Sequence, residues 1–306
     1  MLKTPVLFII FNRPDTVNKV FEAIRTARPK ELYITADGPR PEKGEEEILN
    51  CKKAREIVNN IDWDCKVKTL FKDNNLGCKN AVSGAISWFF ENVKEGIIIE
   101  DDCLPTQSFF QFCELMLEKY RDNDKIGFIS GTNYLFGKYD KLNSYFFSNH
   151  YFIWGWATYR RVWKNFNVDV INFDPMLFYK HYHNSAFCNY MIQTMEAAIS
   201  GRINTWDIQL AYYLMFNSYI GIIPFRNQIT NLGIEGTHTE DNNYFQNMPI
   251  SLIDTKNIKH PSDIKVRKDI DRLIIKNINK GLNLKEATYL QKASFKIKKY
   301  LFFQKF

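Results

Sequence analysis

Three adjacent acids, Glu100, Asp101 and Asp102, are the residues of this sequence whose types and spacing most clearly indicate chemistry. They directly follow an apolar run of one Gly and three Ile at 96–99. Such a run is typical of a strand that is covered on both faces. Carboxylates at the tip of a buried strand repel one another and lose hydration, so we expect a positive partner there. A hard divalent cation with oxygen ligands suits them best.

The same acids also allow a structural interpretation. They could form a solvated loop, or Asp102 could cap the helix expected at 108–120. The strand context favours a ligand site, because ligands of open α/β sheets bind outside the carboxyl ends of the strands. The sequence therefore predicts a metal and diphosphate site at 100–102.

Candidate ligand-binding residues follow three other predicted strands. Asn12 and Arg13 come after the first strand, Asp37 after the second, and Leu76 and Gly77 after the third. A guanidinium can bind a phosphate in a bidentate manner, and a carboxylate can accept a hydrogen bond from a base or a ribose. Taken singly, Arg13 could be a surface residue and Asp37 part of an Asp-Gly turn. A parallel sheet would bring the whole set to the edge that carries the acids.

The elements that must position these residues follow from the hydrophobic pattern. Strands are expected at 6–11, 31–35, 65–71 and 96–99, with helices at 15–26, 45–60, 79–92 and 108–120. This alternation predicts an α/β fold, a mostly parallel sheet with helices on both faces. The pattern is less regular after residue 122, where strands are expected at 128–130 and 218–223 and a helix at 203–216. The polar loop at 227–240 could close over a ligand.

Composition excludes several classes of function. The 306 residues are 45% hydrophobic and 25% charged, as in globular proteins. Residues 256–306 carry 14 Lys and Arg against 4 Asp and Glu, so the remaining chain has a net charge of −3 and nucleic acid is not an expected partner. The six cysteines form no Cys-x-x-Cys pair, which argues against a zinc site. Neither the Gly-rich dinucleotide fingerprint nor the P-loop occurs, so a metal is the expected phosphate holder.

The order and spacing of the motifs resemble a known family. Phe-Asn-Arg-Pro-Asp at 11–15, Ala-Asp-Gly at 36–38, Asn-Leu-Gly at 75–77 and Ile-Glu-Asp-Asp at 99–102 look like the nucleotide-sugar half of GT-A glycosyltransferases. The likeness is closest to the inverting N-acetylglucosaminyltransferase I type and its bacterial relatives, some of them labelled haemolysin-like. It continues through Gly-Trp-Ala at 155–157, Trp-Asp at 206–207 and Gly-Thr-His at 236–238, and covers roughly residues 4–240.

This resemblance implies a Rossmann-like GT-A fold with roles for single residues. Asp102 would ligate a Mn²⁺ or Mg²⁺ ion that bridges the donor diphosphate, and Glu100 and Asp101 would face the ribose and sugar of the donor. Asp207 would be the general base. It is followed by Ile208, where the eukaryotic enzymes carry a further acid.

Other residues would complete the donor site by the same resemblance. Arg13 would contact the nucleotide and Asp37 the uracil, with Asn12, Leu76 and Gly77 beside them. Trp156 would wall the sugar pocket and His238 would lie in the loop that closes on the diphosphate. A Trp at such a place can equally be a core residue, and the histidine an ordinary loop residue.

The expected organisation is a nucleotide-sugar half at 1–125, an acceptor half at 126–255, and a basic, mostly helical tail at 256–306. The expected reaction moves a sugar, with inversion, from a UDP-linked donor to a glycan or lipid-linked acceptor in surface polysaccharide synthesis. A sugar nucleotidyltransferase and a non-catalytic, membrane-active protein are the alternatives.

The sequence has no apolar run of membrane-spanning length and no signal peptide, so a cytoplasmic protein is expected. Residues 289–306 combine five Lys with apolar bulk, which would suit an anionic membrane surface or a helix packed on the body.

Overall fold

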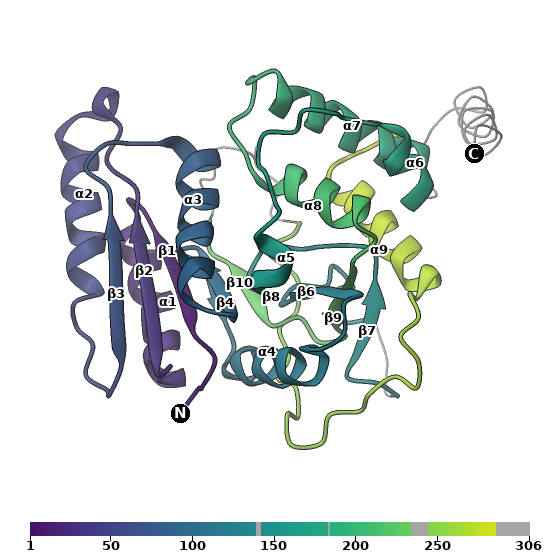
Figure 1. Cartoon of the computed structure of the whole chain (residues 1–306), viewed down its shortest axis with the longest axis horizontal. Helices are drawn as coiled ribbons and strands as arrows, with labels where there is room; N and C mark the ends of the chain where they lie inside the picture. Colours follow the sequence, from purple (N-terminus) through teal and green to yellow (C-terminus); the bar gives the residue numbers. More distant parts are fainter. Residues whose placement is uncertain (139–141, 183, 234–243, 286–306) are drawn as a thin grey trace.

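An eight-stranded mixed sheet forms the centre of the computed structural model, which describes residues 1–138, 142–182, 184–233 and 244–285 (Figure 1). The strand order is β3-β2-β1-β4-β8-β6-β9-β7. The strands are β1 (Val6–Ile10), β2 (Glu31–Ala36), β3 (Lys66–Phe71), β4 (Glu95–Glu100), β6 (Ile126–Ser130), β7 (Tyr145–Ser148), β8 (Trp156–Tyr159) and β9 (Ile220–Pro224). Two short strands, β5 (Cys103–Pro105) and β10 (Ile229–Asn231), pair with each other outside this sheet.

Strand direction decides which loops meet. The strands β3, β2, β1 and β4 are all parallel. The strand β8 runs antiparallel between β4 and β6, so β4 and β6 share a direction, and β9 is parallel to β6. The carboxyl ends of β1, β2, β4, β6 and β9 therefore lie along one edge of the sheet, where ligands of such sheets bind.

Helices cover both faces of the sheet. They are α1 (Pro14–Ala27), α2 (Gly44–Ile57), α3 (Gly77–Asn92), α4 (Gln107–Tyr120), α5 (Arg160–Trp163), α6 (Met176–His181), α7 (Ser185–Ile199), α8 (Asp207–Phe216) and α9 (Lys268–Gly281). The helix α1 contacts α2 and α4, whereas α3 packs on β1 and β2 and contacts α5. The predicted α/β fold class is confirmed as a Rossmann-like mixed sheet with helices on both faces. The elements expected before residue 121 are all present, and most of their ends agree within two residues.

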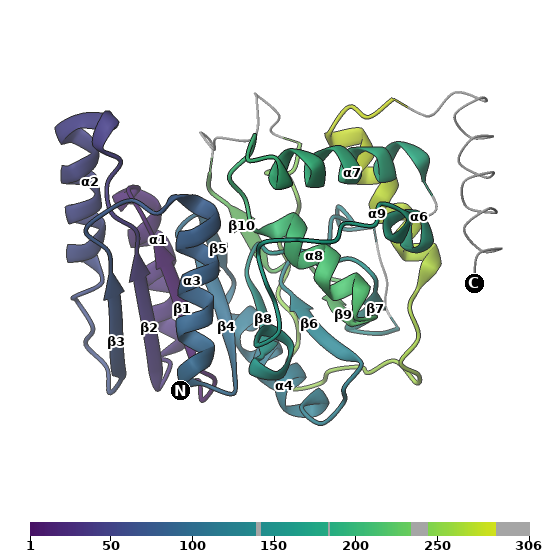
Figure 2. The ribbon, with the colours of Figure 1, turned by 45° about the horizontal axis from the view of Figure 1, so that its top comes forward.

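The second half of the chain has a core of its own. The helices α6, α7 and α8 contact one another, and α9 contacts α7 (Figure 2). Four isoleucines of α9, Ile270, Ile274, Ile275 and Ile278, recur at helical spacing and are buried in this second cluster. The helix α9, which belongs to the predicted tail at 256–306, therefore packs on the body of the protein. The predicted membrane segment at 289–306 lies outside the described residues, and none of the helices within them is long and apolar enough to cross a membrane.

Candidate functional site

The acid triplet sits where β4 ends, next to the turn that follows β1. Glu100 is the last residue of β4. The Asp101 carboxylate accepts a hydrogen bond of 2.8 Å from the backbone N–H of Phe11. The Asp102 carboxylate pairs with the Arg13 guanidinium at 3.0 Å. The structure thus joins Arg13 to the acids, as the sequence predicts.

Helix capping does not explain Asp102. The first turn of α4 is capped by Thr106, whose hydroxyl accepts from the backbone N–H of Phe109 at 3.3 Å. The interpretation of Asp102 as the cap of this helix was therefore wrong. The Asp102 side chain keeps 22% of its surface accessible beside Arg13, which leaves room for a ligand.

The carboxyl groups of the triplet oppose one another's ionisation, and Arg13 offsets this only in part. Burial, followed by the charges of Asp102 and Asp101, raises the pKa of Glu100 well above its usual range. Burial and the charge of Asp102 raise the pKa of Asp101 to about 7. The Arg13 charge opposes both shifts. A cation bound at this place would favour the ionised carboxylates.

The loop at 227–240, which the sequence predicts to close over a ligand, starts next to the acid triplet. The strand β10 pairs antiparallel with β5, directly after the acids. The backbone N–H of Leu232 donates to the Asp102 carbonyl at 2.7 Å. A Cβ on Gly233 would lie 2.8 Å from an Asp102 carboxylate oxygen, so only glycine fits there without a shift. The next residues, 234–243, and with them His238, lie outside the described part of the chain.

Asp37 is tied to the start of α3. Its carboxylate accepts hydrogen bonds from the backbone N–H groups of Leu76 at 3.0 Å and Gly77 at 3.2 Å. Burial raises the pKa of Asp37, and these bonds oppose that rise. Gly77 has a φ of +74°, which a residue with a side chain rarely adopts. The residues predicted after β2 and β3 therefore meet, as the parallel sheet requires.

Asp207 is the first residue of α8. One carboxylate oxygen accepts from the Thr205 hydroxyl and, at 2.8 Å, from the backbone N–H of Ile208. The other accepts no hydrogen bond from any residue that the structure describes. The charge of Asp207 is among those that raise the pKa of Glu100, which places the predicted base near the triplet.

Trp156 occupies the core instead of a cavity wall. Its side chain is 1% exposed, and its ring stacks on Phe128 at 4.8 Å and on Trp206 at 6.0 Å. No surface is left for a sugar, so the position matches the core alternative. Because Trp206 directly precedes Asp207, the Trp156 ring packs against the start of α8.

Sequence reasoning missed Glu47, a buried carboxylate of α2. It accepts from the Asn12 side chain at 2.8 Å and from the backbone N–H of Arg40 at 2.7 Å, and it also pairs with the Arg40 guanidinium. These bonds to Arg40 lower the pKa of Glu47 to about 2. The carboxylate therefore fixes the turn that carries Arg13.

Sequence reasoning also missed Arg55, which lies on α2 as well. Its guanidinium donates to the backbone carbonyls of Asp37 at 3.0 Å and Lys72 at 2.6 Å. It also lies over the ring of Phe71, 5.2 Å from the centroid. Arg55 thus clamps the segments that follow β2 and β3. In the sequence, both residues stand among other charged residues of a helix, where a solvated face is the ordinary interpretation.

The described residues contain no group of three His, Cys, Asp or Glu side chains that could hold a metal ion. A cation bound by one or two carboxylates and by the phosphates of a substrate needs no such group, as is usual for Mg²⁺. Asp102, partly accessible and next to two further carboxyl groups, fits a metal of this kind.

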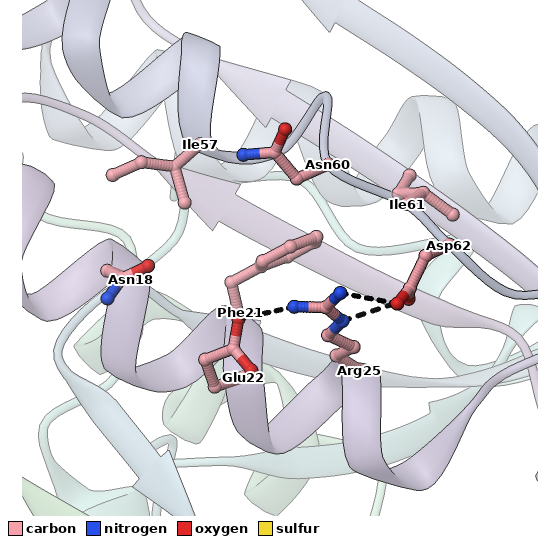
Figure 3. Close-up of a pocket in the computed structure, with 8 residues that line it drawn as sticks. All are labelled: Asn18, Phe21, Glu22, Arg25, Ile57, Asn60, Ile61 and Asp62. Atoms are coloured by element: carbon pink, nitrogen blue, oxygen red, sulfur yellow. Dashed lines mark hydrogen bonds and ion pairs between the residues drawn. The ribbon is translucent and has the colours of Figure 1, made fainter.

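A surface hollow of about 390 Å³ lies elsewhere, between α1 and the end of α2 (Figure 3). Arg25 spans it by pairing with Asp62 and Glu22. Asp62 precedes β3 and Arg25 precedes β2, so this hollow lies at the amino ends of the strands. Since ligands bind at the opposite edge in open α/β sheets, we assign no function to it.

No protein-family model and no curated protein matches the sequence. UDP-glucose pyrophosphorylase, solved with UDP-glucose, is 10% identical, with a TM-score of 0.40 over 76% of this chain and 94% of its own. HddC from Yersinia pseudotuberculosis is 9% identical, with a TM-score of 0.31 over 53% of this chain and 79% of its own. The glycosyltransferase GlyE of Streptococcus pneumoniae TIGR4 is 9% identical, with a TM-score of 0.33 over 72% of this chain and 45% of its own. Likenesses of this size assign no activity to the chain.

Proposed function

We propose that this protein is an inverting GT-A glycosyltransferase that uses a UDP-linked sugar donor. One observation carries the proposal. Asp207, with one carboxylate oxygen open, and the Arg13–Asp102 pair of the acid triplet lie at the carboxyl edge of the sheet. Transfer from a nucleotide diphosphate needs both, because the leaving diphosphate must be neutralised and the acceptor hydroxyl deprotonated.

In this proposal Arg13 binds the nucleotide diphosphate and Asp37 the base. Asn12, Leu76 and Gly77 line the same side, and Glu100 and Asp101 face the ribose and the sugar. Asp102 would hold a Mn²⁺ or Mg²⁺ ion, which would neutralise charge on the diphosphate without a proton transfer. The tie from Glu47 to Asn12 supports this arrangement, because it preorganises the turn before Arg13 is engaged.

Asp207 takes the proton from the acceptor hydroxyl. Its free carboxylate oxygen supports this role, since the other oxygen is already bound at the start of α8. A single displacement at the anomeric carbon inverts the configuration and needs one base and no covalent nucleophile. The acceptor we propose is a glycan or a lipid-linked oligosaccharide.

The test is donor binding and cleavage. Thermal unfolding is measured with UDP-sugars and Mn²⁺, and released UDP is measured over time, because a bound ligand raises the unfolding temperature by mass action. We expect a metal-dependent shift that Asp102→Ala removes. Asp64→Ala is the matched control, since Asp64 is exposed and precedes β3 at the opposite edge.

Three results would overturn the proposal. The first is an equal shift for Asp102→Ala and the parent protein. The second is the absence of any nucleotide-sugar binding. The third is formation of pyrophosphate from UTP and a sugar 1-phosphate, which would make the protein a nucleotidyltransferase.

A further inference from the structure

The segment that follows β6 carries two aromatic residues in an unusual backbone conformation. Tyr134 has a φ of +52° and Phe136 a φ of +53°. Bulky residues rarely adopt this left-handed region, and they keep it only where the surroundings enforce it. Since β6 is parallel to β4, this segment lies at the same edge of the sheet as the acid triplet.

Buried polar side chains enforce the conformation. The Asn133 amide donates to the carbonyls of Pro224 at 3.0 Å and Phe225 at 2.9 Å, and its oxygen accepts from the backbone N–H of Leu135. The Asn277 amide of α9 donates to the Tyr134 carbonyl at 2.8 Å. The backbone around Tyr134 is thus held from the end of β9 and from α9.

A second aromatic segment is fixed against the first. The Thr132 hydroxyl donates to the Trp154 carbonyl at 3.0 Å, and the Ser130 hydroxyl donates to the Phe152 carbonyl at 2.9 Å. The Tyr134 ring then contacts the Phe152 ring at 4.5 Å and the Trp154 ring at 5.7 Å. Both hydroxyls are fully buried, so the two segments form one rigid unit.

The half-buried aromatic groups of this unit suit a sugar. Tyr134 and Trp154 are partly exposed. Within the described ranges, neither the Tyr134 hydroxyl nor the Trp154 indole N–H has a hydrogen-bond partner. Aromatic rings with a polar end offer an apolar face and a hydrogen-bonding group together, which is what the C–H face and the hydroxyls of a pyranose require.

Asp207 is connected to this unit through the core, because Trp154 is two residues before Trp156, whose ring stacks on Trp206, the residue before Asp207. Burial is the main cause that raises the pKa of Tyr134 and of Tyr190 of α7, and the charge of Asp207 makes a smaller contribution to both. A ligand on Tyr134 would therefore lie within the electrostatic influence of the Asp207 carboxylate.

We propose that Tyr134 and Trp154 form a subsite that binds one sugar ring of the acceptor and presents a hydroxyl of it to Asp207. This inference rests on the proposed function, because it names the acceptor side of the same site. It makes the acceptor a carbohydrate at the point of transfer, whether or not a lipid is attached further along.

The experiment uses a set of methyl glycosides of glucose, galactose, mannose and N-acetylglucosamine as probes. Saturation-transfer nuclear magnetic resonance reports which of their ring protons touch the protein, with and without UDP and Mg²⁺. We expect ring-proton transfer for at least one glycoside. Trp154→Ala should reduce it at least fivefold, and Tyr134→Phe, which keeps the ring and loses the hydroxyl, at least twofold. Phe216→Ala is the control, because Phe216 is an exposed aromatic residue at the far end of α8.

Two outcomes would overturn the subsite. In one, no glycoside receives saturation from the intact protein in either condition. In the other, transfer persists undiminished in both variants while their thermal unfolding shows that they are folded. Thermal unfolding with UDP and Mn²⁺ distinguishes failure of the subsite from failure of the proposed function. If UDP with Mn²⁺ raises the unfolding temperature but no glycoside binds, only the subsite is contradicted. If a glycoside binds but UDP with Mn²⁺ leaves the unfolding temperature unchanged, the donor site is contradicted and the subsite is kept.

Discussion

The carboxylate of Asp207 has one oxygen engaged at the start of α8 and one open, so it can act on a hydroxyl without moving the helix. Asp207→Asn keeps the size of the side chain and removes its basicity. We expect the thermal shift by UDP and Mn²⁺ to stay and turnover to fall by roughly 10²–10⁴-fold. Rates of UDP release check this, with Asp64→Asn as the control. Near-parental turnover would reject Asp207 as the base.

Glu47 makes a prediction about acid stability. Its folded pKa of about 2 lies below the usual value of 4.5, so its contribution to stability is complete above pH 4.5 and is lost as the pH falls toward 2. At neutral pH this contribution is at most about 3 kcal/mol. Glu47→Gln should therefore lower the free energy of unfolding at pH 7, and the difference from the parent protein should shrink on acidification.

Urea unfolding between pH 3 and 7 measures this difference. Glu45→Gln is the matched control, because Glu45 lies in the same helical turn and is exposed. A difference between Glu47→Gln and the parent that does not change with pH would show that the Glu47 charge is unimportant. Comparison with the parent also cancels the opposing effect of the triplet, whose raised pKa values favour the folded state in acid.

At the scale of an element, the start of α3 depends on a glycine. Gly77 has a φ of +74°, and a Cβ there would lie 2.6 Å from the Asn204 side chain. Gly77→Ala should destabilise the protein by about 1–3 kcal/mol. The same helix offers the opposite test. Gly84 lies within α3 with nothing near its missing Cβ, so Gly84→Ala should stabilise by about 0.4–1 kcal/mol. Thermal unfolding compares the two variants. If both substitutions raised or both lowered the stability, the different roles of Gly77 and Gly84 would be contradicted.

Elements with a strong hydrophobic pattern could be predicted from the sequence. Elements whose place depends on contacts with residues far away in the sequence could not. The Ile run of β4 and the apolar stripe of α4 need only local periodicity, and both lie where they were expected. The antiparallel strand β8 sits inside an aromatic-rich stretch without a clear period, and its place between β4 and β6 follows from tertiary packing alone.

The site shows the same division. Arg13 and Asp37 could be found because they directly follow strands, and the parallel sheet then places them. Glu47 could not, because only the fold reveals that its side chain turns inward while its neighbours in the same turn stay in water. The strained backbone at Tyr134 leaves no mark in the sequence.

At the scale of the molecule, the excess of positive charge lies in residues 256–306, and the helix α9 is part of this segment. The helix α9 belongs to the body, since its isoleucines are buried against the second core. A chain that stops after residue 265 would lose α9 and expose that core, so we expect it to unfold at a much lower temperature or to aggregate. A chain that stops after residue 287 keeps α9 and should unfold close to the parental temperature. Calorimetry of the two truncations checks this, and equal unfolding temperatures would contradict it.

The same longer truncation tests the membrane hypothesis. Residues 288–306 carry five Lys and no acid, and each basic residue near an anionic bilayer contributes about 1 kcal/mol. We expect the full chain to co-sediment with vesicles that contain anionic lipid, and less so at high salt, because salt screens the attraction. The chain that stops after residue 287 should stay in the supernatant and keep its thermal shift with UDP and Mn²⁺. Neutral vesicles are the control. Equal sedimentation of the two chains would assign any membrane contact to the body, whereas loss of the UDP shift on truncation would show that the tail supports the donor site.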